Sequence, residues 1–534
     1  MELLVDCSRS PNQELSHTAQ DIAVENLRIL IPGGFFGELK QILAPAQLPS
    51  DLLPNLLETV DFMLKHDAAS PRMKPELLAE VAKWRSGLVP RDIHARVVAA
   101  VGQEMMGHYG EGGDAPWNIE LNAIAQELLK DRSLLRENLE WLCSDEARAA
   151  SAFGAALGKL DKEAQLIETV MNGIGEHHST TFAVGYLGGL LSASPARAST
   201  VNTLIDSLVE RSPRDAFQFI TAGGDLVHAF ERVTKLVRDG RLGVEYLRAF
   251  DVGMGDGQGR WRQLTAVETL SVLKLYAAAN AQNNERALDA SVHFLWSQTM
   301  PTSGRDPGEI FGNPAMARLA RKIFFASAET GGYYWREAIT KMLPFDSTFV
   351  IETCARSMLE GNVIAEREAQ TALAAAAPEY AMPVLQALTP YIHSKKTKWK
   401  FQILKFGELV RKLPGPIVGN WLDKVGVDGA IALARSLPAP YLDDKQTPVV
   451  PEPTLTVLQR FGNNKDIFNS FCTGLHSFQT YSGDIAAQHM REAAVAKAFL
   501  NHDMDIIRRW AEEEIRWSER EAKRERQEQE ELGI

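Results

Sequence analysis

The chain has 534 residues, of which 45% are hydrophobic and 24% are charged. This composition is typical of a folded globular protein and excludes a chain that is disordered throughout. One hydrophobic core rarely serves so many residues, so we expect several domains or one elongated array. The formal net charge of −12 argues against a protein built mainly to hold nucleic acid or an anionic membrane.

The cysteines and the N-terminal residues indicate the compartment. Four cysteines lie far apart in the sequence, which predicts reduced thiols rather than a disulfide framework or a zinc site. They are Cys7, Cys143, Cys354 and Cys472. The start, MELLVDCSRS, lacks the basic and apolar regions of a secretory signal, and no run approaches the ~20 apolar residues of a membrane helix. We therefore expect a soluble, cytoplasmic protein without a membrane partner.

Helical spacing of apolar residues runs through the chain from its first third. Met73–Ser86 and Arg91–Met106 have apolar residues three or four positions apart, as an amphipathic helix requires. The segment Thr180–Tyr276 is the most regular, and Ser194–Pro195 and Ser212–Pro213 each place a capping serine before a first-turn proline. This segment predicts about six helices joined by short linkers, the spacing of antiparallel neighbours.

Two proline-rich segments predict boundaries. Met300–Pro314 and Leu437–Pro453 cannot continue a helix, and helical spacing returns beyond each of them, for example at Tyr334–Met342 and Ile364–Ala377. No stretch shows sustained alternation of apolar and polar residues, so we predict an all-α fold. The predicted regions are an N-terminal helical region at 1–107, a central helical-repeat region at 118–299, a second helical region at 315–436, C-terminal helices at 454–517 and a charged tail at 518–534.

The C-terminal segment Phe499–Ile515 points to the architecture. A polar break separates two helical patterns, and the second places Ile507, Ala511 and Ile515 on one face. A pair of short helices cannot bury such a face alone and must stack on another pair. We therefore predict an α-solenoid of antiparallel helix pairs, with a solvated, fraying end after Trp517.

The same segment resembles the second helix of a HEAT repeat, through Ile507, Arg508, Ala511 and Ile515. The resemblance implies a HEAT or armadillo-like α-solenoid in which Arg508 pairs with an aspartate of a neighbouring turn, either Asp503 or Asp505. A second, looser match lies at 363–373. There Arg367 and Ala369 are one position too close together for a strict HEAT register.

Thr180–Gly255 and the C-terminal end also resemble helical regions of large bacterial antiviral defence proteins. This resemblance implies that the array senses or scaffolds, and that chemistry belongs to a separate NTPase, nuclease or NAD-consuming partner. The chain itself predicts no catalytic, cofactor-binding or metal-binding residues. Gly253–Gly259 lacks the third glycine of a dinucleotide-binding loop, and His177–His178 lacks a second ligand at helical spacing.

Two segments are candidate binding sites. The loop 474–484 is rich in hydroxyl and imidazole groups, which are the residue types of acid–base chemistry. Its candidate residues are His476, Ser477, Tyr481 and Asp484, the last of which also suits the N-cap of a helix beginning at Ile485. The segment 395–400 is basic, and its candidate residues are Lys395, Lys396, Lys398, Trp399 and Lys400.

Three functions follow from these features. The leading hypothesis is a non-enzymatic helical-repeat scaffold or recognition protein that binds another protein, as a component of a bacterial antiphage defence system. The alternative is a nucleic-acid-binding α-solenoid that uses the lysines for phosphates and Trp399 for a base, although a solvated basic face over core aromatics is the favoured interpretation of these residues. A hydrolase centred on His476 and Asp484 has only residue types in its favour.

Overall fold

A computed structural model describes the chain except for residues 46, 68–69, 71, 104–115, 177–178, 223–225, 252–253, 256–260, 282–283, 398, 404–405, 477–483 and 533–534. Within the described residues the fold is all-α, with thirty α-helices and two short antiparallel strand pairs, so the predicted fold class is confirmed. The chain forms two compact units, Met1–Gly243 with Met254–Arg262, and Val244–Gly253 with Gln263–Ile534.

Unit 1 contains fifteen of the described α-helices and one strand pair. Its elements are α1 Glu2–Ser8, α2 Gln13–Glu25, α3 Leu27–Leu30, α4 Phe36–Ile42, α5 Leu53–Phe62, η1 Met63–Asp67, α6 Pro75–Leu88, α7 Ile93–Val101, α8 Pro116–Lys130, α9 Arg132–Leu142, α10 Ala150–Leu160, α11 Ile167–Glu176, α12 Thr181–Ala193, η3 Pro195–Arg197, α13 Ala198–Arg211, α14 Pro213–Ala222, α15 Leu226–Arg238, β1 Met254–Gly255 and β2 Trp261–Arg262.

Unit 2 contains the other fifteen. Its elements are η4 Val244–Phe250, α16 Ala266–Asn280, α17 Glu285–Thr299, η5 Pro301–Ser303, α18 Gly308–Phe311, α19 Pro314–Ala326, α20 Tyr333–Met342, α21 Ser347–Glu360, α22 Val363–His393, α23 Lys400–Ile403, α24 Gly407–Arg411, α25 Gly415–Val425, α26 Val427–Ala434, β3 Tyr441–Leu442, β4 Pro448–Val449, α27 Glu452–Phe461, α28 Lys465–His476, α29 Ile485–Lys497 and α30 Asp505–Leu532.

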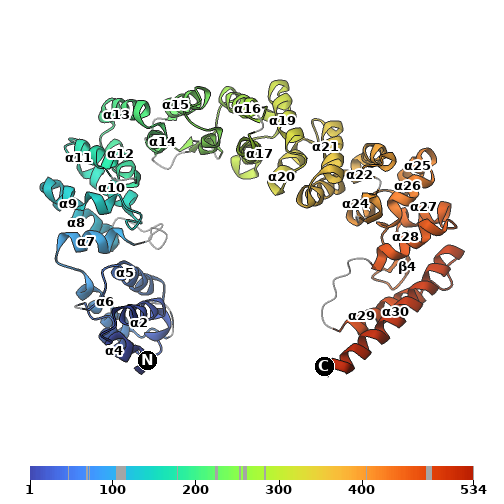
Figure 1. Ribbon diagram of the computed structural model, residues 1–534, viewed down its shortest axis with the longest axis horizontal. Helices are drawn as coiled ribbons and strands as arrows, with labels where there is room; N and C mark the ends of the chain where they lie inside the picture. The colour runs from blue at the N-terminus through green and yellow to red at the C-terminus, as the bar shows by residue number, and fades with distance from the viewer. Residues whose placement is uncertain are drawn as a thin grey trace. The chain divides into compact units, whose positions relative to one another are not determined.

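Inside each unit, helices that are close in sequence lie side by side, so the colour changes gradually from one helix to the next (Figure 1). Local chemistry sets where many of them begin. Asp92 accepts a hydrogen bond from the backbone nitrogen of Ala95 at the start of α7, and Thr265 and Glu268 form a capping box at the start of α16. Many packed helices with local neighbours are compatible with the predicted repeat architecture.

The closest helix packing in unit 1 is between α10 and α12. Gly154 and Gly158 of α10 face Gly185 and Gly189 of α12, and a Cβ atom added at Gly158 would lie 2.0 Å from the backbone oxygen of Tyr186. A Cβ added at Gly185 would lie 2.1 Å from the backbone oxygen of Ser151. Only glycine lets the two backbones approach this closely, which explains the glycines of the sequence GYLGGLL.

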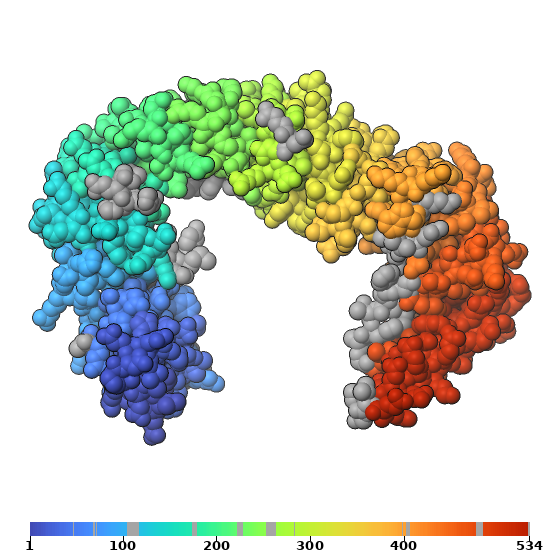
Figure 2. Space-filling model, in the orientation of Figure 1, coloured from blue at the N-terminus to red at the C-terminus, as the bar shows by residue number. Residues whose placement is uncertain are grey.

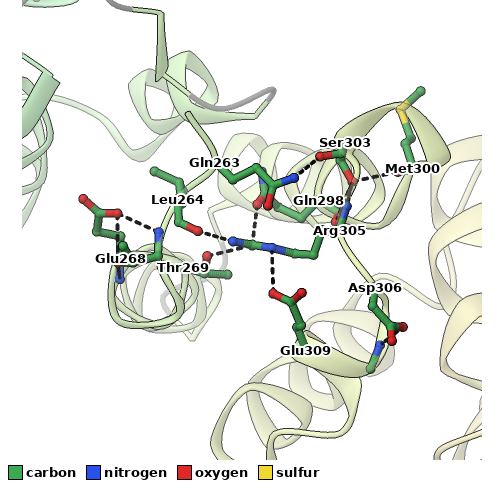
Figure 3. Close-up of polar contacts among 12 residues, drawn as sticks. Gln263, Leu264, Glu268, Thr269, Gln298, Met300, Ser303, Arg305, Asp306 and Glu309 are labelled. Atoms are coloured by element: carbon green, nitrogen blue, oxygen red, sulfur yellow. Dashed lines mark hydrogen bonds and ion pairs between the residues drawn. The ribbon is translucent and has the colours of Figure 1, made fainter. Parts of the chain in front are cut away.

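A buried arginine joins the first helices of unit 2 (Figure 3). Nη1 of Arg305 donates hydrogen bonds to Oγ1 of Thr269 on α16 at 3.0 Å and to Oε1 of Gln298 on α17 at 2.8 Å. Its Nη2 donates to the backbone oxygen of Leu264, and Gln298 in turn donates to the backbone oxygen of Asp251 at 2.7 Å. Figure 3 shows the guanidinium at the centre of this network.

The two segments predicted as boundaries both lie inside unit 2. Met300–Pro314 carries the buried Arg305, and Leu437–Pro453 carries the strand pair β3–β4, in which Tyr441 faces Val449. The predicted division into five regions stays a prediction. In the described helices, none is both long and apolar enough to cross a membrane.

Two of the three residues on the predicted face, Ile507 and Ala511 of α30, are fully buried, and the third, Ile515, is partly buried. Of the two predicted partners of Arg508, Asp505 pairs with it through Oδ1, 3.0 Å from Nη2 of the arginine, and Asp503 accepts a hydrogen bond at its backbone oxygen. Asp505 is the first residue of the same helix, not a residue of a neighbouring turn. The prediction of a fraying end after Trp517 is wrong: α30 continues to Leu532, and Ser518 and Ala522 are buried. Small residues at these positions give the charged segment a narrow buried face without large apolar side chains, and α30 packs on α29.

Candidate docking surface

Helix α22 reverses direction within its length. Tyr380 has non-helical backbone angles, φ −116° and ψ 32°, and divides the helix into two parts. Near the end of α22, Tyr391 lines a groove together with Arg356 of α21, the preceding helix, although a straight helix of 31 residues would separate the two ends of α22 by about 45 Å. The two ends of α22 therefore lie near each other, and the turn that precedes the helix and the segment that follows it share one edge of unit 2.

Three turns meet at this edge. The backbone nitrogen of Asn362, in the turn between α21 and α22, donates to the backbone oxygen of Glu329, in the turn between α19 and α20, at 3.0 Å. Lys400, after α22, lies close enough for its charge to lower the pKa of Glu366, which burial raises. In Figure 2 the yellow and orange parts of unit 2, which contain these turns, form one continuous surface.

Six large apolar side chains at these turns are exposed, and we call them the rim. The rim residues are Phe325, Tyr333, Tyr334, Val363, Ile364 and Trp399. The exposed fraction of the side chain is 54% for Tyr333, 58% for Ile364 and 82% for Val363. Scattered exposed apolar residues are ordinary, but a contiguous group at one edge is typical of a binding surface.

The tyrosines of the rim belong to a rigid aromatic cluster. The ring of Tyr334 lies 4.5 Å from that of Trp296 and 5.0 Å from that of His293, both on α17. Nδ1 of His293 lies 2.6 Å from Oδ2 of the buried Asp251, whose pKa burial raises to about 7. Because packing holds these rings in place, a partner would meet them without an additional loss of side-chain entropy.

Carboxylates surround the tyrosine part of the rim. Arg356 stacks on the ring of Phe325 at 4.2 Å and pairs with Glu329 at 2.6 Å and Glu360 at 3.3 Å. Arg336 pairs in the same way with two glutamates, Glu337 at 2.7 Å and Glu368 at 3.1 Å. A third arginine, Arg367, pairs with Glu368 at 3.2 Å. Four carboxylates thus share three arginines, and this part of the rim, which we call the acidic end, is left with one excess negative charge.

The predicted basic segment is at the other end of the rim. Lys395 and Lys396 are exposed, while Lys398 lies outside the described residues. Trp399 is 49% exposed and its Nε1 donates to the backbone oxygen of Lys396 at 2.8 Å, so the indole is held in place at the surface rather than packed inward. We call Lys395, Lys396 and Lys400 the basic end of the rim.

A groove of about 580 Å³ opens beside the rim between α21 and the second part of α22. Phe325 and Arg356 border both the groove and the rim, and Pro383 and Pro390 line its opposite wall. Pro383 also explains the break at Tyr380, because a proline inside a helix removes a hydrogen bond and clashes with the carbonyl group four residues earlier, here that of Glu379.

In the second predicted candidate, the loop 474–484, His476 lines a separate pocket of about 740 Å³ between α28 and α30. His476 ends α28 and its ring stacks on Trp517 of α30 at 3.5 Å. Asp484 accepts a hydrogen bond from the backbone nitrogen of Ala487, so its predicted role as the N-cap of α29 is confirmed. Ser477 and Tyr481 lie outside the described residues.

The pocket brings His476 next to Glu514 rather than next to a described residue of its own loop. Nε2 of His476 lies 3.3 Å from Oε2 of Glu514, which is buried. Burial, followed by the neighbouring charge of Glu492, raises the pKa of Glu514 to about 7. Burial likewise raises the pKa of the pocket's Cys472 thiol to about 12, so at neutral pH this group is a thiol and not a nucleophilic thiolate.

Neither candidate forms a metal site in the described part of the chain, where no group of three or more His, Cys, Asp or Glu residues is arranged to hold an ion. The histidines at 177–178 and most of the glycine-rich loop 253–259 lie outside that part. A scan against models of protein families, a search of curated proteins and a search of solved structures each found no match for this chain.

The tyrosine part of the rim is absent from the sequence-based candidates. The sequence predicted a helix at 334–342 and another at 364–377, but the exposed positions lie at the first residues of α20 and α22, where helical spacing does not distinguish inside from outside. The one local signal is a run of adjacent large apolar residues directly after a turn, as in Tyr333–Tyr334 and Val363–Ile364.

Proposed function

We propose that this protein is a non-enzymatic helical scaffold whose rim docks a protein partner. The observation that supports the proposal is the rim, in which exposed apolar side chains lie at turns that meet, with charged groups around them. Interfaces between proteins are enriched in aromatic residues and arginine, and their energetic centres are apolar groups surrounded by a polar border. The rim has exposed aromatic and aliphatic side chains, and Arg336 and Arg356 lie beside them.

We further propose that the array is HEAT-like and acts in bacterial antiphage defence. The first part is supported by the buried Ile507 and by the pairing of Arg508 with Asp505, although this ion pair lies within α30 and is exposed. A sensing or scaffolding array would leave chemistry to a separate NTPase, nuclease or other effector. The rim would provide the surface for docking, and Cys472, as a neutral thiol, would not act as a nucleophile.

In-cell photo-crosslinking tests this function. A photoreactive phenylalanine analogue at Tyr333 should give a reproducible protein adduct, with or without phage challenge, and the adduct should weaken at least fivefold in an Ile364→Ser background. The matched control is the same analogue at Val267, which is 78% exposed on α16 but outside the rim. An equal yield of adduct at Val267, or no adduct at Tyr333, would contradict the proposal.

A further inference from the structure

The two ends of the rim carry opposite charge, and its centre is aliphatic. The acidic end contains four glutamates, Glu329, Glu337, Glu360 and Glu368, and the three arginines that pair with them, so it has an excess of one negative charge. Residues 394–400 contain four lysines and no acidic residue. Val363 and Ile364 lie between the acidic end and the basic end. The turn just before them contacts Glu329 of the acidic end. Glu366, just after them, lies near Lys400 of the basic end.

We infer that the partner of the rim is a second copy of this chain, bound around a two-fold axis. In such a dimer the same surface of both copies forms the interface, and the two surfaces run antiparallel. Every contact between two residues across the axis therefore occurs twice, with the roles of the two copies exchanged. A surface that is negative at one end and positive at the other complements itself in this arrangement. The inference rests on the proposed docking role of the rim and names its partner.

The centre of the rim fits the position on the axis. Val363 is 82% exposed and Ile364 is 58% exposed, at the first two positions of α22. Next to a two-fold axis these side chains would pack against their own copies, and burying aliphatic surface is favourable without any need for a polar partner. The basic end of each copy would then face the acidic end of the other, so that every charge contact occurs twice.

The aromatic groups at both ends strengthen this pairing. The indole of Trp399 is held by its hydrogen bond to Lys396, and Tyr333 has Arg336 over its ring at 5.1 Å. The lysines of one copy would lie near the tyrosine faces as well as the carboxylates of the other, and a cation over an aromatic face is attracted to it. Both ends are thus rigid and chemically matched.

Charge reversal tests the inference, and each arginine of the acidic end keeps one glutamate partner in the variants. Arg356 keeps Glu360 when Glu329 is changed, and Arg336 keeps Glu368 when Glu337 is changed. The acidic end is therefore reversed as Glu329→Lys with Glu337→Lys, and the basic end as Lys395→Glu with Lys396→Glu. A charge-matched control is Lys445→Glu with Lys465→Glu, two exposed lysines of unit 2 outside the rim.

Analytical ultracentrifugation of the full chain at 0.1 M and 0.5 M salt gives the readout. The unmodified protein should form a species of twice 59.1 kDa. Each reversed variant alone should raise the dimer dissociation constant at least tenfold, because both charge contacts become repulsive. An equimolar mixture of the two variants, and a single chain carrying all four changes, should each restore the dimer.

Two results would overturn the inference. One is an unmodified protein that stays monomeric at 100 μM, which is ~100 times a micromolar dissociation constant. The other is a dimer whose dissociation constant is the same in the reversed variants as in the Lys445 and Lys465 control. The crosslink at Tyr333 separates this failure from failure of the proposed function. An adduct of the chain with itself supports both, whereas an adduct with a different protein supports the docking function and overturns the two-fold dimer.

Discussion

Glu514 and His476 come from different helices and meet inside the C-terminal pocket, where Oε2 of the glutamate lies 3.3 Å from Nε2 of the histidine. Ser518 donates a hydrogen bond to the other carboxylate oxygen of Glu514 at 3.4 Å, and Glu492 of α29 adds a second negative charge nearby. Burial makes the charged form of Glu514 costly, which is why its pKa is raised to about 7.

This raised pKa predicts that the stability of α28–α30 falls as the pH rises. The unfolded carboxyl group has a pKa of 4.5, so between pH 4.5 and about 7 the folded protein holds a proton that the unfolded chain has lost. Raising the pH through this window therefore lowers the free energy of unfolding, by up to about 3 kcal/mol, and the loss is complete above pH 7.

Hydrogen exchange of peptides within 465–532, measured from pH 5 to pH 8 and corrected for intrinsic exchange rates, checks this prediction. The variant Glu514→Gln stays neutral, so its protection should vary much less with pH than that of the unmodified protein. Glu512→Gln, on the exposed face of the same helix, is the matched control and should keep the original pH dependence. Equal pH dependence in the unmodified protein and Glu514→Gln would contradict the assignment.

Replacing Gly158 by alanine should destabilise unit 1 severely. The added Cβ would lie 2.0 Å from the backbone oxygen of Tyr186, and backbone atoms of two packed helices cannot move apart without losing the contacts around them. We expect a loss of about 3 kcal/mol or more, measured by urea denaturation. Gly87→Ala on α6 is the control: no atom lies within 4 Å of the new Cβ, so the helix should gain roughly 0.5–1 kcal/mol.

Replacing Arg305 by methionine should destabilise unit 2. The hydroxyl of Thr269, the amide oxygen of Gln298 and the backbone oxygen of Leu264 would all lose a donor in a buried site. Removing one partner from a buried charged network costs roughly 3–5 kcal/mol. Thermal unfolding should show a lowered midpoint for Arg305→Met, whereas Arg318→Met, on an exposed position of α19, should leave it nearly unchanged.

Parts of this structure that depend on local spacing were predictable from the sequence. The all-α class, the buried positions Ile507 and Ala511, and the capping role of Asp484 each follow from residues within one or two turns of a helix. The predicted helix 364–377 also ends just before Pro378, and the reversal of α22 at Tyr380 follows three residues later. Local signals identify such elements because helix geometry relates near neighbours only.

The rim and the pocket could not be predicted because each depends on contacts between distant segments. Tyr334 and His293 are 41 positions apart in sequence but 5.0 Å apart in space, and Glu514 lies 38 positions after the histidine it contacts. The basic segment 395–400 was recognised from composition, yet its place opposite an acidic surface follows from the reversal within α22. Charge patterns along the chain do not reveal which patches share an edge.

The basic end of the rim also bears on the nucleic-acid alternative, because exposed lysines beside the exposed Trp399 are the groups that a single strand would use. Mobility shifts with single- and double-stranded DNA and RNA should show no salt-sensitive binding, since the nearby acidic end and the net charge of −12 oppose a polyanion. If strands did bind, the logarithm of the affinity would fall linearly with the logarithm of salt concentration. In that case the variant Lys395→Glu with Lys396→Glu would abolish the mobility shift, and the Lys445 and Lys465 control would preserve it. These results would contradict protein docking and support nucleic-acid binding as the function of the rim.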